Sequence, residues 1–135
     1  MPQTDIGKLA AIAQDHSQNE DDRTTAIHAM GRLPADEAIP HLIALMRDDA
    51  LSVRWAAATT LRKYGREMLG PLLRTLATQP ADHRFYESAH HALTRFGSPA
   101  IEEILAPVLD ALTQSGAASA VPSVAMDALE KLKTA

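Results

Sequence analysis

The sequence predicts an all-α fold of four helical hairpins, about eight helices in all, stacked into an α-solenoid with a right-handed superhelical course. Three observations predict this fold. One helical pattern occurs four times, a second apolar pattern precedes each copy, and the composition favours helices. Aromatic residues make up only 4% of the 135 residues, so the core must be built from aliphatic side chains. Such a composition is typical of helices rather than sheets.

The stronger pattern marks the second helix of each hairpin. Its four copies align without gaps and start at residues 22, 53, 85 and 121. In each copy the matching apolar residues fall at offsets 4, 7, 8 and 11, which is helical spacing. The alanines that coincide are Ala26, Ala57, Ala89 and Ala125. Self-similarity of this kind is the signature of a repeat architecture.

A weaker apolar pattern marks the first helix of each hairpin. Its four copies begin at Ile6, Ile39, Leu69 and Leu105. The second apolar residue of each copy precedes the repeat alanine by 15 to 17 residues, which leaves room for a helix and a short turn. We therefore expect one domain over residues 1–135, with repeats at about 5–34, 35–65, 66–97 and 98–135.

Glycine and proline mark the boundaries of the expected helices. Gly65 and Gly97 follow the last core aromatic of a second helix, where a left-handed C-terminal cap is favoured. Ser98 and Pro99 form a typical helix start. Prolines also fall within the first helices of the last three repeats, at Pro40, Pro71 and Pro107. A proline there removes a backbone hydrogen bond, so we expect each of these helices to be kinked.

Composition and motifs exclude several classes of function. The chain has no cysteine, which excludes disulfides, thiolate metal sites and a cysteine nucleophile. A net charge of −4 gives no general attraction to nucleic acid or anionic membranes. No apolar run approaches the roughly 20 residues of a membrane span, and no signal peptide is evident. Without a phosphate loop or cofactor motif, we expect a soluble, cytoplasmic, non-catalytic protein that binds no cofactor.

The segment 38–65 resembles a HEAT repeat, and more narrowly the short bacterial HEAT-like type of phycobilin lyase subunits. The matching features are an apolar first helix, Asp48 in the turn, Val53 and Arg54 opening the second helix, and an ending in alanine, leucine and glycine. The resemblance covers nearly the whole chain. It implies a ladder in which turn aspartates pair with arginines between repeats. Arg23 occupies the arginine position, whereas Tyr86 and Pro122 do not, so we expect an interrupted ladder.

In stacks of this type the second helices usually line the concave side, so their outward positions are the candidate binding surface. The single tryptophan, Trp55, falls on this line, and exposed tryptophan is typical of binding hot spots. Its alternative role is packing against a neighbouring helix. The candidate residues are Trp55, Thr59, Arg62, His28, Glu87 and His91. We interpret the chain as a protein–protein interaction module that binds a peptide segment or helix of another protein.

A basic residue recurs near the end of every second helix. These residues are Arg32, Lys63, Arg95 and Lys131. Cations suit the last turn of a helix because they complement its dipole, and this explanation is sufficient by itself. A functional alternative is an anion-binding column, which would make the chain a nucleic-acid-binding HEAT-like protein. The net negative charge argues against that alternative.

Three further hypotheses concern metals, enzymes and self-association. Adjacent His90 and His91 point in different directions on a helix, and Glu87 with His91 offers only two ligands, so we expect no metal site. The resemblance to bilin lyases suggests an accessory subunit of a lyase-type enzyme as an alternative role. A stack of four repeats can also leave an apolar end exposed, which favours assembly of the domain with copies of itself.

Overall fold

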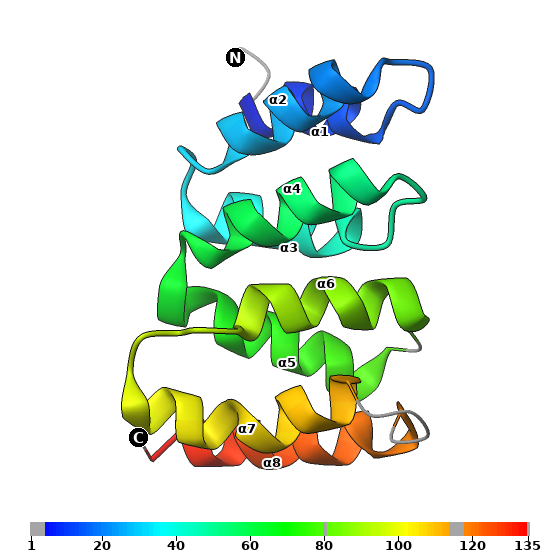
Figure 1. Ribbon diagram of the computed structural model, residues 1–135. Coiled ribbons are helices and arrows are strands. Elements are labelled where there is room, and N and C mark those ends of the chain that lie inside the picture. Colours follow the sequence, from blue (N-terminus) through cyan, green and yellow to red (C-terminus); the bar gives the residue numbers. More distant parts are fainter. Residues whose placement is uncertain (1–4, 80, 114–117, 135) are drawn as a thin grey trace. The chain divides into compact units, whose positions relative to one another are not determined.

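The computed structural model describes residues 5–79, 81–113 and 118–134, and in these residues it contains helices and no strand (Figure 1). The eight α-helices are α1 (Asp5–Gln14), α2 (Glu20–Met30), α3 (Ala35–Leu45), α4 (Leu51–Arg62), α5 (Leu69–Thr78), α6 (His83–Leu93), α7 (Pro99–Thr113) and α8 (Val121–Leu132). Short 3₁₀ helices, η1 (Gly65–Met68) and η2 (Ala118–Ala120), precede α5 and α8. The all-α fold of helical repeats predicted from the sequence is confirmed.

The helices form two compact units. Unit 1 spans residues 1–64 and holds α1 to α4, whereas unit 2 spans residues 65–135 and holds α5 to α8. The division falls between the second and third of the predicted repeats.

In unit 1 two helical hairpins pack in the same orientation. α1 pairs with α2 and α3 with α4, while α2 packs on α4 and α1 on α3. Two side-chain contacts fix the register of the second helices: Ser52 donates to Glu20, and Thr60 Oγ1 lies 3.3 Å from His28 Nδ1. Both pairs are 32 residues apart. α2 and α4 therefore run parallel, in a register close to the sequence repeat.

The core of unit 1 is aliphatic, as its composition predicts. The repeat alanines Ala26 and Ala57 are buried, and their small side chains allow neighbouring helices to approach closely. Larger side chains fill the remaining space, among them Ile27, Met30, Leu42, Met46 and Leu61. Packing of these amphipathic faces, rather than helix propensity, is the main source of stability for helices this short.

A buried ion pair joins the two hairpins of unit 1. The Arg23 guanidinium donates to the Asp48 carboxylate, and both side chains are almost fully buried. Arg23 Nε also donates to the Ala13 carbonyl oxygen at 2.9 Å, and Asp48 accepts from the Ala50 amide at 2.9 Å. Arg54 donates to the Asp48 carbonyl oxygen from the other side. The turn aspartate and the repeat arginine thus form one rung between neighbouring hairpins.

The hairpins of unit 2 pack in a different order. The closest helix contacts are α5 with α8, α7 with α8 and α6 with α7. A repetition of the unit 1 arrangement would instead place α8 on α6 and α7 on α5. Figure 1 shows α7 running antiparallel to α6. In unit 2 the second helix of one hairpin, α6, thus packs on the first helix of the next, α7, whereas in unit 1 the second helices α2 and α4 pack on each other.

The connection between α6 and α7 accounts for this difference. Thr94 leaves α6 with an extended backbone (ψ 145°), and Arg95 and Gly97 both have positive φ, at 55° and 89°. Ser98 Oγ then accepts from the Ile101 amide, and Glu102 accepts from the Gly97 amide, so the start of α7 is capped on both sides. The predicted left-handed conformations of Gly97 and Gly65 (φ 57°) are confirmed.

The three prolines do not occupy equivalent places. Pro40 and Pro107 lie inside α3 and α7, as predicted. Pro71 is instead the third residue of α5, because that helix begins at Leu69 directly after η1. In the first turn of a helix a proline removes no backbone hydrogen bond, so Pro71 lacks the main cause of the expected kink.

Candidate functional site

The parallel helices α2 and α4 present one continuous surface in unit 1, which we call the α2–α4 face. It consists of Glu20, Thr24 and His28 from α2 and of Leu51, Trp55, Thr59 and Arg62 from α4. These residues recur every three or four positions and so share one side of their helices. The face therefore combines residues from one side of two successive second helices.

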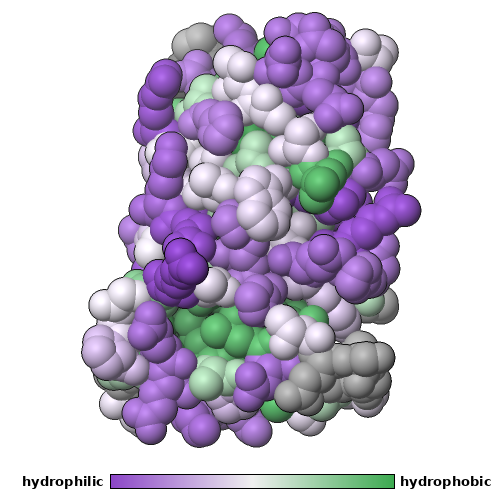
Figure 2. Space-filling view, in the orientation of Figure 1, coloured by the Kyte–Doolittle hydropathy of each residue, from purple (hydrophilic) through white to green (hydrophobic). Residues whose placement is uncertain are grey.

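Two large apolar side chains are exposed on this face. Trp55 is 49% exposed and Leu51 is 62% exposed, and the two residues are one helical turn apart on α4. In Figure 2 a small, strongly hydrophobic patch lies at the N-terminal end of α4. The remaining predicted residues of unit 1 surround it: His28 is exposed, while Thr59 and Arg62 are half-buried.

Hydrogen bonds hold the helices beneath the face in place. The single hydroxyl proton of Tyr64 is shared between the carbonyl oxygens of Met30 at 2.9 Å and Leu33 at 2.6 Å, so Tyr64 caps the end of α2 from the end of α4. Thr60, which is fully buried, pairs with His28. These bonds act at the C-terminal end of the face, and the Arg23–Asp48 pair acts near the other end. Trp55 and Leu51 of α4 therefore lie on a face whose two helices, α2 and α4, are held together at both of its ends.

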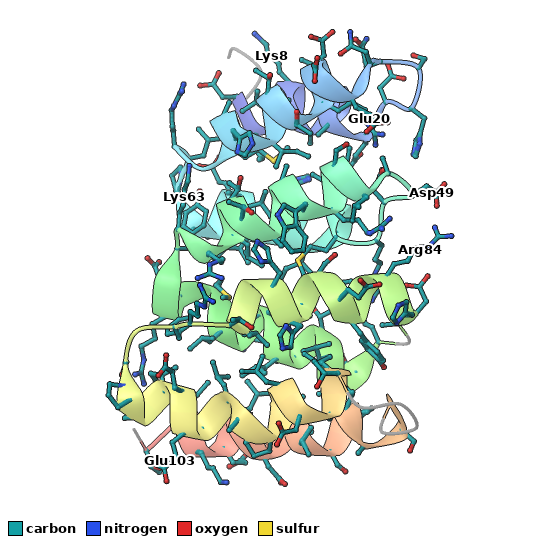
Figure 3. All side chains as sticks on the ribbon, viewed as in Figure 1. Lys8, Glu20, Asp49, Lys63, Arg84 and Glu103 are labelled. Atoms are coloured by element: carbon teal, nitrogen blue, oxygen red, sulfur yellow. The ribbon has the colours of Figure 1, made fainter. Side chains whose placement is uncertain are left out.

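The ends of the face carry opposite charges. Glu20 and Asp21 lie in the first turn of α2, whereas Arg62 ends α4 and is followed by Lys63. Figure 3 shows Glu20 and Lys63 at opposite ends of the paired helices. Both sets of charges complement the dipoles of their own helices. As a consequence, the apolar pair lies between an acidic end and a basic end.

The predicted residues of unit 2 lie on α6. Glu87 is exposed, and its carboxylate lies 2.7 Å from His83 Nε2, one turn earlier in the helix. His91 is half-buried. Figure 2 also shows hydrophobic side chains gathered between α6 and α7, which is a second apolar surface that sequence reasoning did not identify.

The basic residues do not all recur at equivalent places in the structure. Arg32 and Lys63 are exposed and follow the ends of α2 and α4 in unit 1. In unit 2, Arg95 follows α6, whereas Lys131 lies on α8, which packs mainly on α5. The structure therefore does not align Lys131 with Arg95. The reason is the reversed packing of the last hairpin, which sequence alignment alone cannot show.

The described residues contain no group of three or more His, Asp or Glu side chains that could hold a metal ion. In the same part of the chain, no helix combines the length and the apolar character that crossing a membrane requires.

The sequence pattern identifies Trp55 but not Leu51, because it begins the second helix at Val53 whereas α4 begins at Leu51. The signal was present, since Leu51 precedes Trp55 by four residues and Asp48 ends the previous turn. A helix start placed two residues earlier, at Leu51 instead of Val53, puts both apolar side chains on one exposed line.

Comparison with known families agrees with the repeat pattern. A family model described as HEAT repeats matches residues 6–94, from the start of α1 to the residue after α6. The last hairpin, which packs in a different order, lies outside this match. Comparison with curated proteins and comparison with solved structures give no match. The narrower resemblance to the phycobilin lyase type stays a prediction.

Proposed function

Because the chain belongs to the HEAT-repeat family, we propose that it is a non-catalytic protein-binding module whose binding surface is the α2–α4 face. HEAT repeats commonly serve as protein-interaction scaffolds. The proposed ligand is a peptide segment or helix of another protein, laid along the two parallel helices.

The observation that carries this proposal is the exposure of Trp55 beside Leu51. Trp55 is 49% exposed and Leu51 is 62% exposed, and burial of apolar surface is the main favourable term in protein association. Tryptophan is among the residues most enriched at binding hot spots, because it offers a large rigid surface and one hydrogen-bond donor. The two side chains together provide the apolar centre that interfaces of this kind require.

The rigidity of the face supports the same proposal. A ligand that binds a preorganised surface loses less free energy to the ordering of side chains and backbone. Here the hydrogen bonds of Tyr64 and the pair of Thr60 with His28 fix the spacing of α2 and α4 before any partner arrives.

The charges at the two ends of the α2–α4 face favour a partner segment in which apolar, basic and acidic residues follow a particular order. Its apolar residues would cover Trp55 and Leu51, its basic residues would lie near Glu20, and its acidic residues near Lys63. A helix with acidic residues at its start and basic residues at its end has this pattern when it runs antiparallel to α4. The nucleic-acid alternative is less favoured, because Lys131 lies on α8, which packs mainly on α5, whereas Arg95 follows α6, and because the net charge is −4.

The test is affinity capture from the native lysate with tagged wild type, a Leu51→Ala/Trp55→Ala variant and a Met126→Ala variant. Met126 is a matched control, because it is 50% exposed but lies on α8 in unit 2. We expect wild type and Met126→Ala to retain the same protein, and the double variant to lose about tenfold or more of it. Equal capture by all three proteins would contradict the proposal and would favour another surface, such as the one between α6 and α7.

A further inference from the structure

A hollow of about 380 Å³ lies on the outer face of the first hairpin. Its lining includes Leu9 and Ile12 of α1 and Asp22, Thr25, Ala26 and Ala29 of α2. All of its lining residues come from α1, α2 or the turn between them, so the hollow belongs to unit 1 alone. It is separate from the α2–α4 face, whose residues lie on the other exposed side of α2.

The residues that line this hollow can be compared with the residues at the corresponding positions of the second hairpin. The positions in the second hairpin that correspond to Leu9, Ile12 and Ala29 are Leu42, Leu45 and Thr60, and all three are buried. Thr60 is turned toward the first hairpin, since it pairs with His28 of α2. Positions that are buried in the second hairpin therefore line an open hollow in the described part of the first hairpin.

The uncovered face is complementary to itself. Ile12 is 39% exposed at the edge of the hollow, so one surface carries both an apolar projection and an apolar recess. A surface of this kind can pair with its own copy about a two-fold axis, which places each Ile12 against the recess of the other subunit. A head-to-tail contact would need a second, different surface and would not close.

The charges around the hollow fit this pairing. Lys8 lies one turn before Ile12 on α1, and Asp22 lies at the rim on α2, where the second hairpin has Val53. Figure 3 shows Lys8 pointing away from α3 and α4. A two-fold dimer of this face carries Lys8 and Asp22 twice, so each copy offers one cation and one anion to the other. The result is an apolar centre with a charged rim, as in protein interfaces generally.

We propose that the outer α1–α2 face binds the same face of a second copy of this chain, forming a two-fold dimer that leaves both α2–α4 faces open. Ile12 is the apolar anchor of this interface, and Lys8 with Asp22 sets its orientation.

The test is sedimentation equilibrium of the full chain from low micromolar to sub-millimolar concentration. Wild type is expected to show a monomer–dimer equilibrium, and Ile12→Glu to weaken it by about tenfold or more. Leu51→Glu is the matched control, because Leu51 is more exposed than Ile12 but lies on the α2–α4 face; it is expected to dimerise like wild type. A wild type that stays monomeric throughout, or an Ile12→Glu variant that dimerises normally, would overturn the proposal.

A charge exchange tests the arrangement. Lys8→Glu is expected to weaken the dimer, and Lys8→Glu/Asp22→Lys to restore it, because the exchange preserves the pairing. Failure of the exchange to restore the dimer would overturn the two-fold arrangement. Circular dichroism of each variant distinguishes a lost interface from a lost fold. Ile12→Glu should also still capture the partner through Trp55, so the dimer and the proposed function can fail independently.

Discussion

The Arg23–Asp48 pair shows how a single residue can hold two repeats together. Both side chains are removed from water, and each also satisfies a backbone group of its surroundings. Removing water from two charges is costly, so a pair of this kind is stable only when the geometry and the hydrogen bonds are complete. Its main effect is to make other arrangements of the two hairpins unfavourable.

Removing one member of the pair should therefore be strongly destabilising. Asp48→Ala leaves a buried, uncompensated guanidinium, and we expect the free energy of unfolding to fall by about 3–5 kcal/mol. Urea denaturation followed by circular dichroism measures this loss. Lys133→Ala is the control, since it removes an exposed ion pair with Glu130 and should cost at most about 1 kcal/mol. Equal losses for both variants would contradict the structural role of the buried pair.

Asp15 in the first turn gives a prediction about protonation. The Ser17 hydroxyl donates to its carboxylate at 2.6 Å and the Ser17 amide donates at 2.9 Å. These bonds favour the charged form and lower the pKa of Asp15. A lowered pKa in the folded state stabilises the protein above the ordinary pKa, and this contribution is lost as the pH falls through the lowered value. Ser17→Ala should raise the pKa of Asp15, as measured by an NMR titration; an unchanged pKa would argue against the hydroxyl as its main cause.

At the scale of the helices, two glycines differ in the effect that replacement by alanine should have on stability. Gly97 has a φ of 89°, which other residues adopt only with strain, so Gly97→Ala should destabilise the protein by about 1–3 kcal/mol. Gly70 lies inside α5 with only the flexible end of the Arg74 side chain nearby. Gly70→Ala should therefore stabilise by up to about 1 kcal/mol. Thermal unfolding of both variants measures the difference, and a Gly97→Ala variant as stable as wild type would contradict the role assigned to this connection.

The helices themselves could be predicted from the sequence, because their apolar residues recur at helical spacing and glycines mark their ends. The four repeat alanines are buried, and the predicted start of α7 agrees with the structure. The predicted end of α6 at Gly97 is wrong, because α6 ends at Leu93 and Thr94 leaves it with an extended backbone. Leu51 was missed because the boundary of α4 depends on the turn that Asp48 and Arg54 build. These bonds span only two and six residues and add nothing to the apolar pattern, so the four-residue spacing of Leu51 and Trp55 is the only sequence signal for this helix start.

At the scale of the whole molecule, the family and the repeat could be predicted, but the order of packing in unit 2 could not. The last hairpin has the same apolar spacing as the others, yet α7 packs on α6 and α8 on α5. Its orientation is set by the backbone of Thr94, Arg95 and Gly97 rather than by the apolar pattern. For the same reason Lys131 looked equivalent to Arg95 in sequence and is not equivalent in space.

The central claim is that partner binding covers Trp55, and the chain contains its own probe for this event. Trp55 is the single tryptophan, so intrinsic tryptophan fluorescence arises from the α2–α4 face alone when the partner or partner peptide used has no tryptophan. The measurement is the emission spectrum of the full chain during titration with the protein that wild type retains. We expect a shift of the emission to shorter wavelength that saturates with binding, because the indole passes from water into an apolar contact. Saturable binding with an unchanged emission spectrum would contradict the claim.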